Sequence, residues 1–110
     1  MQKTINVCGK EVVLKTNGLV PLTYKKEFKR DYFSDVHETT KDNYDIELLY
    51  NLLWVYAKTA DSGIPSMYEW LEGFEALPIT KYIGDIIELT TFCITTKEPL
   101  QKKTEAAAKA

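Results

Sequence analysis

Residues 44–60 constrain the fold most, because apolar side chains surround nearly the whole of the helix that they predict. Five of them recur at the spacing of one helical face: Ile46, Leu49, Leu53, Tyr56 and Ala60. Four more lie outside that face: Leu48, Leu52, Trp54 and Val55. Asp42 or Asn43 can cap the start of this helix. A helix that is apolar nearly all round is buried in a protein or covered by a partner, so we expect it to be the central helix.

The N-terminal residues show the pattern of a β-hairpin. Residues 4–7 and 11–16 are rich in β-branched side chains, and Cys8-Gly9-Lys10 between them includes a glycine that can adopt a positive φ. A hairpin alone is marginally stable in water. We therefore expect it to pack against the helices.

Three more helices are expected around the central one. An aromatic ridge at every fourth residue predicts a single helix over about 21–37, formed by Tyr24, Phe28, Tyr32 and Val36. Ser66 and Glu69 match a capping box and begin a short helix over about 66–75. An isoleucine-rich apolar arc predicts a last helix over about 79–96, with Phe92 on its polar side.

These elements predict a mainly α-helical fold in which a small N-terminal β-hairpin is followed by about four helices. We expect residues 1–97 to form one compact domain and residues 98–110 to be a flexible tail. The end of the tail reads Glu-Ala-Ala-Ala-Lys, the repeat of a helical spacer, which is either natural or added.

Charge and composition exclude several classes of protein. Fourteen basic and sixteen acidic side chains give a net charge of −2, and Arg30 is the single arginine, so we expect no nucleic-acid partner. No apolar run approaches the roughly 18 residues of a membrane span. Without a secretory signal, Cys8 and Cys93 are expected to be reduced thiols, with a disulfide as the alternative. Residues 42–96 are acidic and residues 1–41 basic, which predicts either a solvated surface or self-association.

No pattern for catalysis or for a cofactor stands out. Ser34, Asp35 and His37 lie on one helical turn, where they do not converge as a catalytic triad, so we expect a solvated surface cluster. One histidine and two distant cysteines do not predict a metal site. Five carboxylates spaced by three residues are expected to form solvated helix faces: Glu69, Glu72, Glu75, Asp85 and Glu88. We therefore expect neither an enzyme nor a bound cofactor.

The positive functional signal is the surplus of apolar side chains. A small domain either covers Leu48, Leu52, Val55 and Phe92 with its hairpin and the 21–37 helix, or leaves them exposed for a partner. Both interpretations are open at this point. The second one predicts seven partner-binding residues: Leu48, Leu52, Trp54, Val55, Trp70, Phe74 and Phe92.

The order of these patterns resembles the tail assembly chaperones of long-tailed bacteriophages and prophages. The resemblance spans residues 1 to 103 and rests on Gly9 at the hairpin turn, on Tyr24-x-x-x-Phe28-x-x-Asp31, and on the Leu/Trp/Tyr-rich stretch 48–57. It continues through residues 68–72, a long helix and a lysine-bearing end. Family sequences often have glycine where Lys29 stands, which is a departure here.

The resemblance implies a non-enzymatic role in the cytoplasm of the bacterial host. Such chaperones coat the tape-measure protein, keep it soluble, and recruit tail-tube subunits during tail assembly. A helix-in-groove contact with the tape-measure protein would suit the acidic, aromatic middle of the chain. The alternative is a small helical phage transcription regulator or anti-repressor, whose 21–37 helix would place Lys25, Lys26, Lys29 and Arg30 on phosphate.

Overall fold

The hairpin forms at the N-terminus, as predicted. The computed structural model describes the backbone of residues 1–94 and the side chains of residues 1–92. In it, β1 (Gln2–Val7) pairs antiparallel with β2 (Lys10–Lys15), and Ile5 lies opposite Val12. Cys8 and Gly9 form the turn with φ of 52° and 84°. Positive φ at both positions is the geometry that joins two twisted antiparallel strands with two residues.

The two faces of the hairpin differ in burial because side chains alternate along a strand. Ile5, Val7, Val12 and Leu14 are buried against the helices, whereas Glu11, Val13 and Lys15 point outward. β2 lies against α3 (Glu47–Ala60), so the buried face of the hairpin and the central helix share one core.

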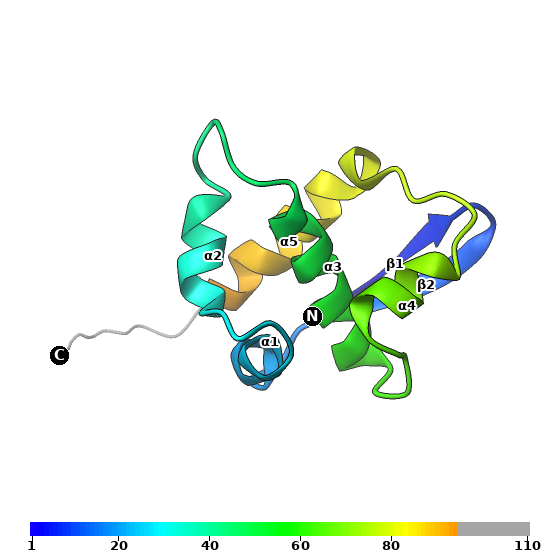
Figure 1. Cartoon of the computed structure of the whole chain (residues 1–110), viewed down its shortest axis with the longest axis horizontal. Helices are drawn as coiled ribbons and strands as arrows, with labels where there is room; N and C mark the ends of the chain where they lie inside the picture. The colour runs from blue at the N-terminus through cyan, green and yellow to red at the C-terminus, as the bar shows by residue number, and fades with distance from the viewer. Residues whose placement is uncertain (95–110) are drawn as a thin grey trace, which may run out of the picture.

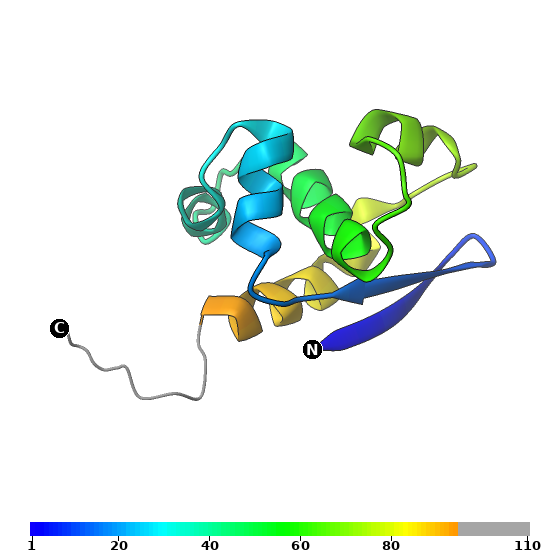
Figure 2. The same ribbon diagram turned by 90° about the horizontal axis from the view of Figure 1, so that it is seen from below.

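The central position predicted for residues 44–60 is confirmed. Helix α3 lies in the middle of both views, with α1, α4, α5 and the hairpin around it (Figures 1 and 2). It starts later than predicted, at Glu47, with Ile46 at the N-cap position and no side chain capping it. The backbone N–H of Glu47 donates to Asp45 Oδ1 at 3.0 Å. Asp42 and Asn43 therefore do not cap it. Tyr56 on α3 reaches Thr90 through their hydroxyl groups, which are 2.5 Å apart.

The single helix predicted over 21–37 is wrong, because the chain breaks between residues 28 and 32. Helix α1 (Val20–Phe28) ends at Lys29, which adopts the left-handed conformation with φ of 59°. Asp31 then caps α2 (Tyr32–Glu38) by accepting the backbone N–H of Ser34 at 2.9 Å. The aromatic spacing survives the break because Tyr24 and Tyr32 pack edge to face, with ring centroids 5.6 Å apart.

The left-handed conformation of Lys29 predicts that Lys29→Gly stabilises the protein. Glycine adopts a positive φ without the steric penalty of a Cβ, although it also loses more chain entropy on folding. We expect a net gain of about 0.5 kcal/mol in the free energy of unfolding, measured by urea denaturation. Lys29→Ala is the matched control and should give no gain, since it keeps the Cβ. Equal effects of the two substitutions would contradict the prediction.

The C-terminal part of the described chain contains two more α-helices. α4 (Met67–Glu72) begins after Ser66, but it is shorter than the predicted 66–75, and the predicted capping box is wrong because no side-chain hydrogen bond caps the helix. A 3₁₀ turn, η1 (Ile79–Tyr82), leads into α5 (Ile83–Ile94). Residues 95–96 of the predicted last helix, the side chain of Cys93 and the predicted tail lie outside the described residues. The described part is thus a small mixed α/β domain with five α-helices, one more than predicted because of the break at Lys29.

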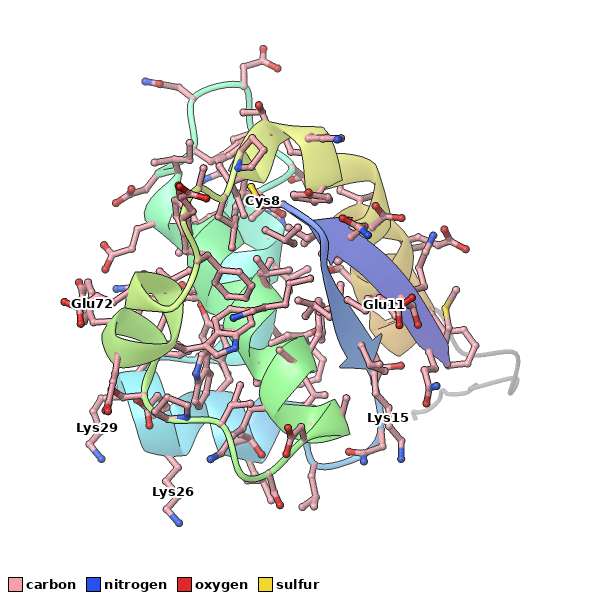
Figure 3. All side chains as sticks on the ribbon, turned by 90° about the vertical axis from the view of Figure 1, so that its right-hand side faces the viewer. Cys8, Glu11, Lys15, Lys26, Lys29 and Glu72 are labelled. Atoms are coloured by element: carbon pink, nitrogen blue, oxygen red, sulfur yellow. The ribbon has the colours of Figure 1, made fainter. Side chains whose placement is uncertain are left out.

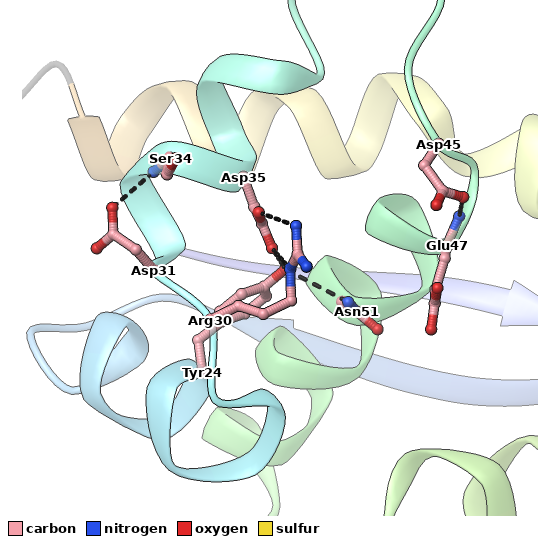
Figure 4. A network of polar contacts seen from close by, with 8 residues as sticks. All are labelled: Tyr24, Arg30, Asp31, Ser34, Asp35, Asp45, Glu47 and Asn51. Carbon is pink, nitrogen blue, oxygen red and sulfur yellow. Dashed lines mark hydrogen bonds and ion pairs between the residues drawn. The ribbon is translucent and has the colours of Figure 1, made fainter.

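A polar network joins α1 to α2 (Figure 4). Asp35 accepts hydrogen bonds from Tyr24 Oη at 2.6 Å and from Arg30 Nε and Nη2 at 2.7 and 2.8 Å. Asn51 on α3 donates to Tyr24 Oη at 3.5 Å. Asp35 is buried, so its predicted place in a solvated surface cluster is wrong. Ser34 and His37 are exposed, as expected.

Candidate partner-binding groove

Four of the seven predicted partner-binding residues are buried inside the chain. Leu48, Leu52, Trp54 and Val55 on α3 are between 0% and 5% exposed. The interpretation that they form a surplus apolar surface is therefore wrong, and the other interpretation holds for them: the hairpin and the preceding helices cover α3.

The break at Lys29 explains how so small a chain covers α3 on nearly every side. It lets α1 lie directly along α3, where Phe28 meets Trp54 with ring centroids 5.5 Å apart. The hairpin covers a second side of α3, and α5 a third. A single straight helix over 21–37 would have carried half of its aromatic ridge away from α3.

Helix α4 is the least covered apolar element among the described residues. Within it only Met67 is buried. Trp70 and Leu71 are partly buried, Phe74 just after the helix is partly buried, and Tyr68 is 71% exposed. The structure thus brings together Trp70 and Phe74, whose ring centroids lie 5.0 Å apart at 85°.

A groove of about 720 Å³ separates α4 from β2. Figure 3 views the molecule from this side, with Glu11 and Lys15 on the hairpin and Glu72 on α4. Trp70 and Phe74 line one wall, residues 10–13 and Lys15 line the other, and Ala57 and Ala60 at the end of α3 also line it. The lining of the groove is therefore mixed, because its apolar side chains lie together with charged side chains of both signs: Lys10, Glu11, Lys15, Asp61 and Glu69.

Hydrogen bonds from α3 hold the loop that leads into α4. Trp54 Nε1 donates to the carbonyl oxygen of Pro65 at 2.9 Å. Lys58 Nζ donates to the carbonyl oxygens of Ser62 and Ile64 at 2.8 and 2.9 Å. Trp54 therefore contributes to the site by fixing the start of α4, rather than by touching a partner.

Contacts at the tip of the hairpin hold the far end of the groove. Lys10 Nζ lies 5.1 Å from the centre of the Phe74 ring and donates to the carbonyl oxygen of Gly73 at 3.3 Å. Cys8 Sγ lies 3.2 Å from the carbonyl oxygen of Ala76. The groove is thus tied at both ends, which favours a preformed binding site.

The other flank of α4 carries a smaller apolar depression of about 260 Å³. Ile46 just before α3 and Tyr50 on α3 line it together with Met67, Tyr68 and Leu71 from α4. Ile46 and Tyr68 are exposed. Apolar surface therefore extends on both sides of the short helix.

Phe92 lies apart from this region. It is 45% exposed on α5, and it does not line the groove. Its predicted place on the polar side of the helix is confirmed, but the structure does not bring it together with Trp70 and Phe74.

Sequence reasoning missed the contribution of β2, and of Ile46 and Tyr68, to this surface. The alternation along β2 already marked Val13 as an apolar residue on the outward face. A two-stranded sheet also leaves one free edge on each strand, whatever its sequence. Together these two signals indicate that β2 can contribute to a binding surface. The position of α4 beside β2 could not be predicted from the sequence.

Other kinds of site find little support in the described residues. No group of three or more His, Cys, Asp or Glu side chains among them is arranged to hold a metal ion. Glu69, Glu72 and Glu75 are exposed, as expected, whereas Asp85 and Glu88 pair with Lys3 at 2.8 and 2.6 Å. Arg30 forms an ion pair with Asp35. The single arginine is therefore already paired and does not belong to the basic face that the transcription-regulator alternative requires.

Comparison of the chain with protein-family models, with curated proteins and with solved structures finds no match. Among the described helices, none is both long and apolar enough to cross a membrane.

Proposed function

We propose that this chain is a phage tail assembly chaperone that binds the tape-measure protein through the apolar surface around α4. In this role it keeps the tape-measure protein soluble in the host cytoplasm and helps to recruit tail-tube subunits. The role is non-enzymatic and needs no cofactor. The resemblance to the chaperone family is the reason for proposing the tape-measure protein as the client. The apolar surface around α4 is the reason for proposing where the client binds.

One observation carries the proposal: α4 buries a single residue, Met67, and leaves apolar side chains uncovered on both flanks. Isolated exposed apolar residues are common, but a cluster rimmed by charges is typical of a surface that binds another protein. Trp70 and Tyr68 belong to the residue types that most often dominate binding energy at such surfaces. Burial of these side chains against the client is reversible, as a chaperone requires.

Coexpression with the tape-measure protein of the same genome tests the proposal. The chain should raise the soluble fraction of the tape-measure protein, and Trp70→Ala combined with Tyr68→Ala should abolish most of that gain. Loss of a hot-spot aromatic residue costs about 2 kcal/mol of binding, or roughly thirtyfold in affinity.

Leu22→Ala is the matched control, because Leu22 is 67% exposed on α1, outside the groove and the depression. It should leave the soluble fraction unchanged, and circular dichroism should show that all variants are folded. A tape-measure protein that aggregates equally with and without the chain would refute the proposal. Equal loss in the α1 control would refute the assignment to α4.

A further inference from the structure

We infer that the groove between β2 and α4 binds a partner segment in extended conformation, which adds as a third, antiparallel strand to the free edge of β2. This gives the conformation and the sequence pattern of a ligand for the site described above. It rests on that site being a protein-binding groove, and it does not depend on the client being a tape-measure protein.

The register of the hairpin shows which backbone groups of β2 face the groove. Thr16 N donates to Met1 O at 2.9 Å, so this pair is hydrogen-bonded across the hairpin. Hydrogen-bonded pairs alternate along an antiparallel ladder. Val12 and Leu14 therefore bond to Ile5 and Lys3 on β1. The N–H and C=O groups of Glu11, Val13 and Lys15 point the other way, toward the groove.

These groups are unused within the described part of the chain, where the backbone of Glu11, Val13 and Lys15 forms no hydrogen bond to another element. The free edge of β1 is different, because Tyr82 Oη donates to Asn6 O at 2.6 Å and Lys3 is held by α5. The edge of β1 is thus covered, whereas the edge of β2 is open beside the groove that Trp70 and Phe74 line. We therefore assign strand addition to β2.

The position of α4 beside β2 favours a single strand over a second copy of the chain. A neighbouring strand lies about 4.8 Å from β2, and Trp70 and Phe74 on the α4 side bound the space beyond it. A second copy pairing through its own β2 would bring β1 and the helices beneath it into the space that α4 fills. An extended segment brings only its own side chains.

Charge along the edge defines the pattern of the ligand. Glu11, Val13 and Lys15 alternate on the outward face as acid, apolar and base. An antiparallel ligand runs in the opposite direction, so its first residue faces Lys15 and its last faces Glu11. Complementary charge then requires an acid opposite Lys15, an apolar residue opposite Val13 and a base opposite Glu11. The two residues between them point inward, where Ala57, Ala60 and Trp70 line the groove. The pattern is acid, three apolar residues and base, as in Glu-Val-Leu-Val-Lys.

Titration of the full chain with a capped, fluorescently labelled Glu-Val-Leu-Val-Lys peptide tests the inference. An ester in place of the leucine amide removes a hydrogen bond to Val13 without adding bulk, and it should weaken binding about fivefold. An ester at either valine is the matched control. The N–H that it removes points away from β2, and the carbonyl before it only becomes a weaker acceptor, so it should weaken binding by less than the leucine ester does. Equal effects at all positions would overturn strand addition.

Two further measurements locate the strand. Hydrogen exchange should slow about tenfold or more at the amides of Glu11, Val13 and Lys15 on peptide binding, and should not change at Val12 and Leu14. The double variant Glu11→Lys with Lys15→Glu should prefer Lys-Val-Leu-Val-Glu by about threefold to tenfold. Circular dichroism confirms that the double variant is folded, because both side chains are exposed.

Four further results would overturn the inference: no binding at about 1 mM peptide, a helical peptide when bound, no reversal of charge preference, or protection of the three amides before peptide is added. The last would mean that a second copy or another segment of the chain already covers the edge. If the peptide does not bind but coexpression raises the soluble fraction of the tape-measure protein, only the extended-strand mode of binding is refuted. If the peptide binds but coexpression does not raise that soluble fraction, only the tape-measure protein as the client is refuted.

Discussion

Leu52→Asp is expected to unfold the domain, rather than to weaken the binding of a client. Leu52 is 1% exposed in the centre of α3. Removing a buried leucine side chain costs about 2–5 kcal/mol, and an unpaired carboxylate in its place costs several kcal/mol more. The sum reaches the whole stability of an ordinary domain, about 5–15 kcal/mol. Far-ultraviolet circular dichroism and urea denaturation at neutral pH measure the loss.

Leu22→Asp provides the comparison for this substitution. It makes the same chemical change at an exposed position of α1, and we expect it to change the free energy of unfolding by no more than about 0.5 kcal/mol. A Leu52→Asp protein with the cooperative unfolding of the native chain would contradict the burial of α3. It would also restore the interpretation of residues 48–55 as an exposed surface.

Asp35→Ala is expected to lower the free energy of unfolding by about 3 kcal/mol. The substitution leaves the buried hydroxyl of Tyr24 without its acceptor, which costs about 1–3 kcal/mol. It also removes the two-bond ion pair with Arg30, whose side chain is half exposed and can partly regain water. Because Asp35 joins α2 to α1, we expect the loss to appear in global unfolding, measured by urea denaturation.

The pKa of Asp35 makes this contribution depend on pH. Burial pushes the pKa of the carboxyl upward, but the hydrogen bonds from Arg30 and Tyr24 outweigh burial and hold the pKa below its ordinary value. A carboxyl with a lowered folded-state pKa stabilises the protein above its unfolded-state value, near pH 4, and loses that effect as the pH falls through the folded-state pKa. The same contacts raise the pKa of Arg30, which stays charged throughout.

Asp35→Asn separates the charge from the packing. The difference in unfolding free energy between the native chain and this variant should be largest above about pH 5 and should shrink below about pH 4. Asp31→Asn is a useful control, because Asp31 is exposed and its capping acceptor is kept. Parallel stability curves for the native chain and Asp35→Asn across this range would refute the assigned role of the carboxylate.

The hairpin and the central helix could be predicted because both depend on local periodicity. Alternation with a glycine turn specifies two strands, and an apolar surround specifies a buried helix, whatever the rest of the chain does. The break between α1 and α2 could not be predicted, because the aromatic spacing of Tyr24, Phe28 and Tyr32 fits one helix as well as two. Lys29 ends α1 and Asp31 caps the start of α2. In the resulting arrangement, Asp35 accepts hydrogen bonds from Tyr24 and Arg30.

The candidate site shows the same division. Trp70 and Phe74 were predicted from the sequence as partner-binding residues, and they line the groove, whereas Leu52 and Val55 carry an equally apolar pattern and lie in the core. Periodicity reports how apolar a helix face is, but not which neighbour covers it.

The sequence by itself therefore determined the kinds of element, the turn between the strands and the identity of the central helix, since each follows from interactions within a few residues. Only the tertiary structure decided which apolar side chains stay exposed and which strand edge faces a groove. Those properties depend on how α1 folds back along α3 and where the loop of residues 61–66 places α4, and such contacts join residues far apart in the chain.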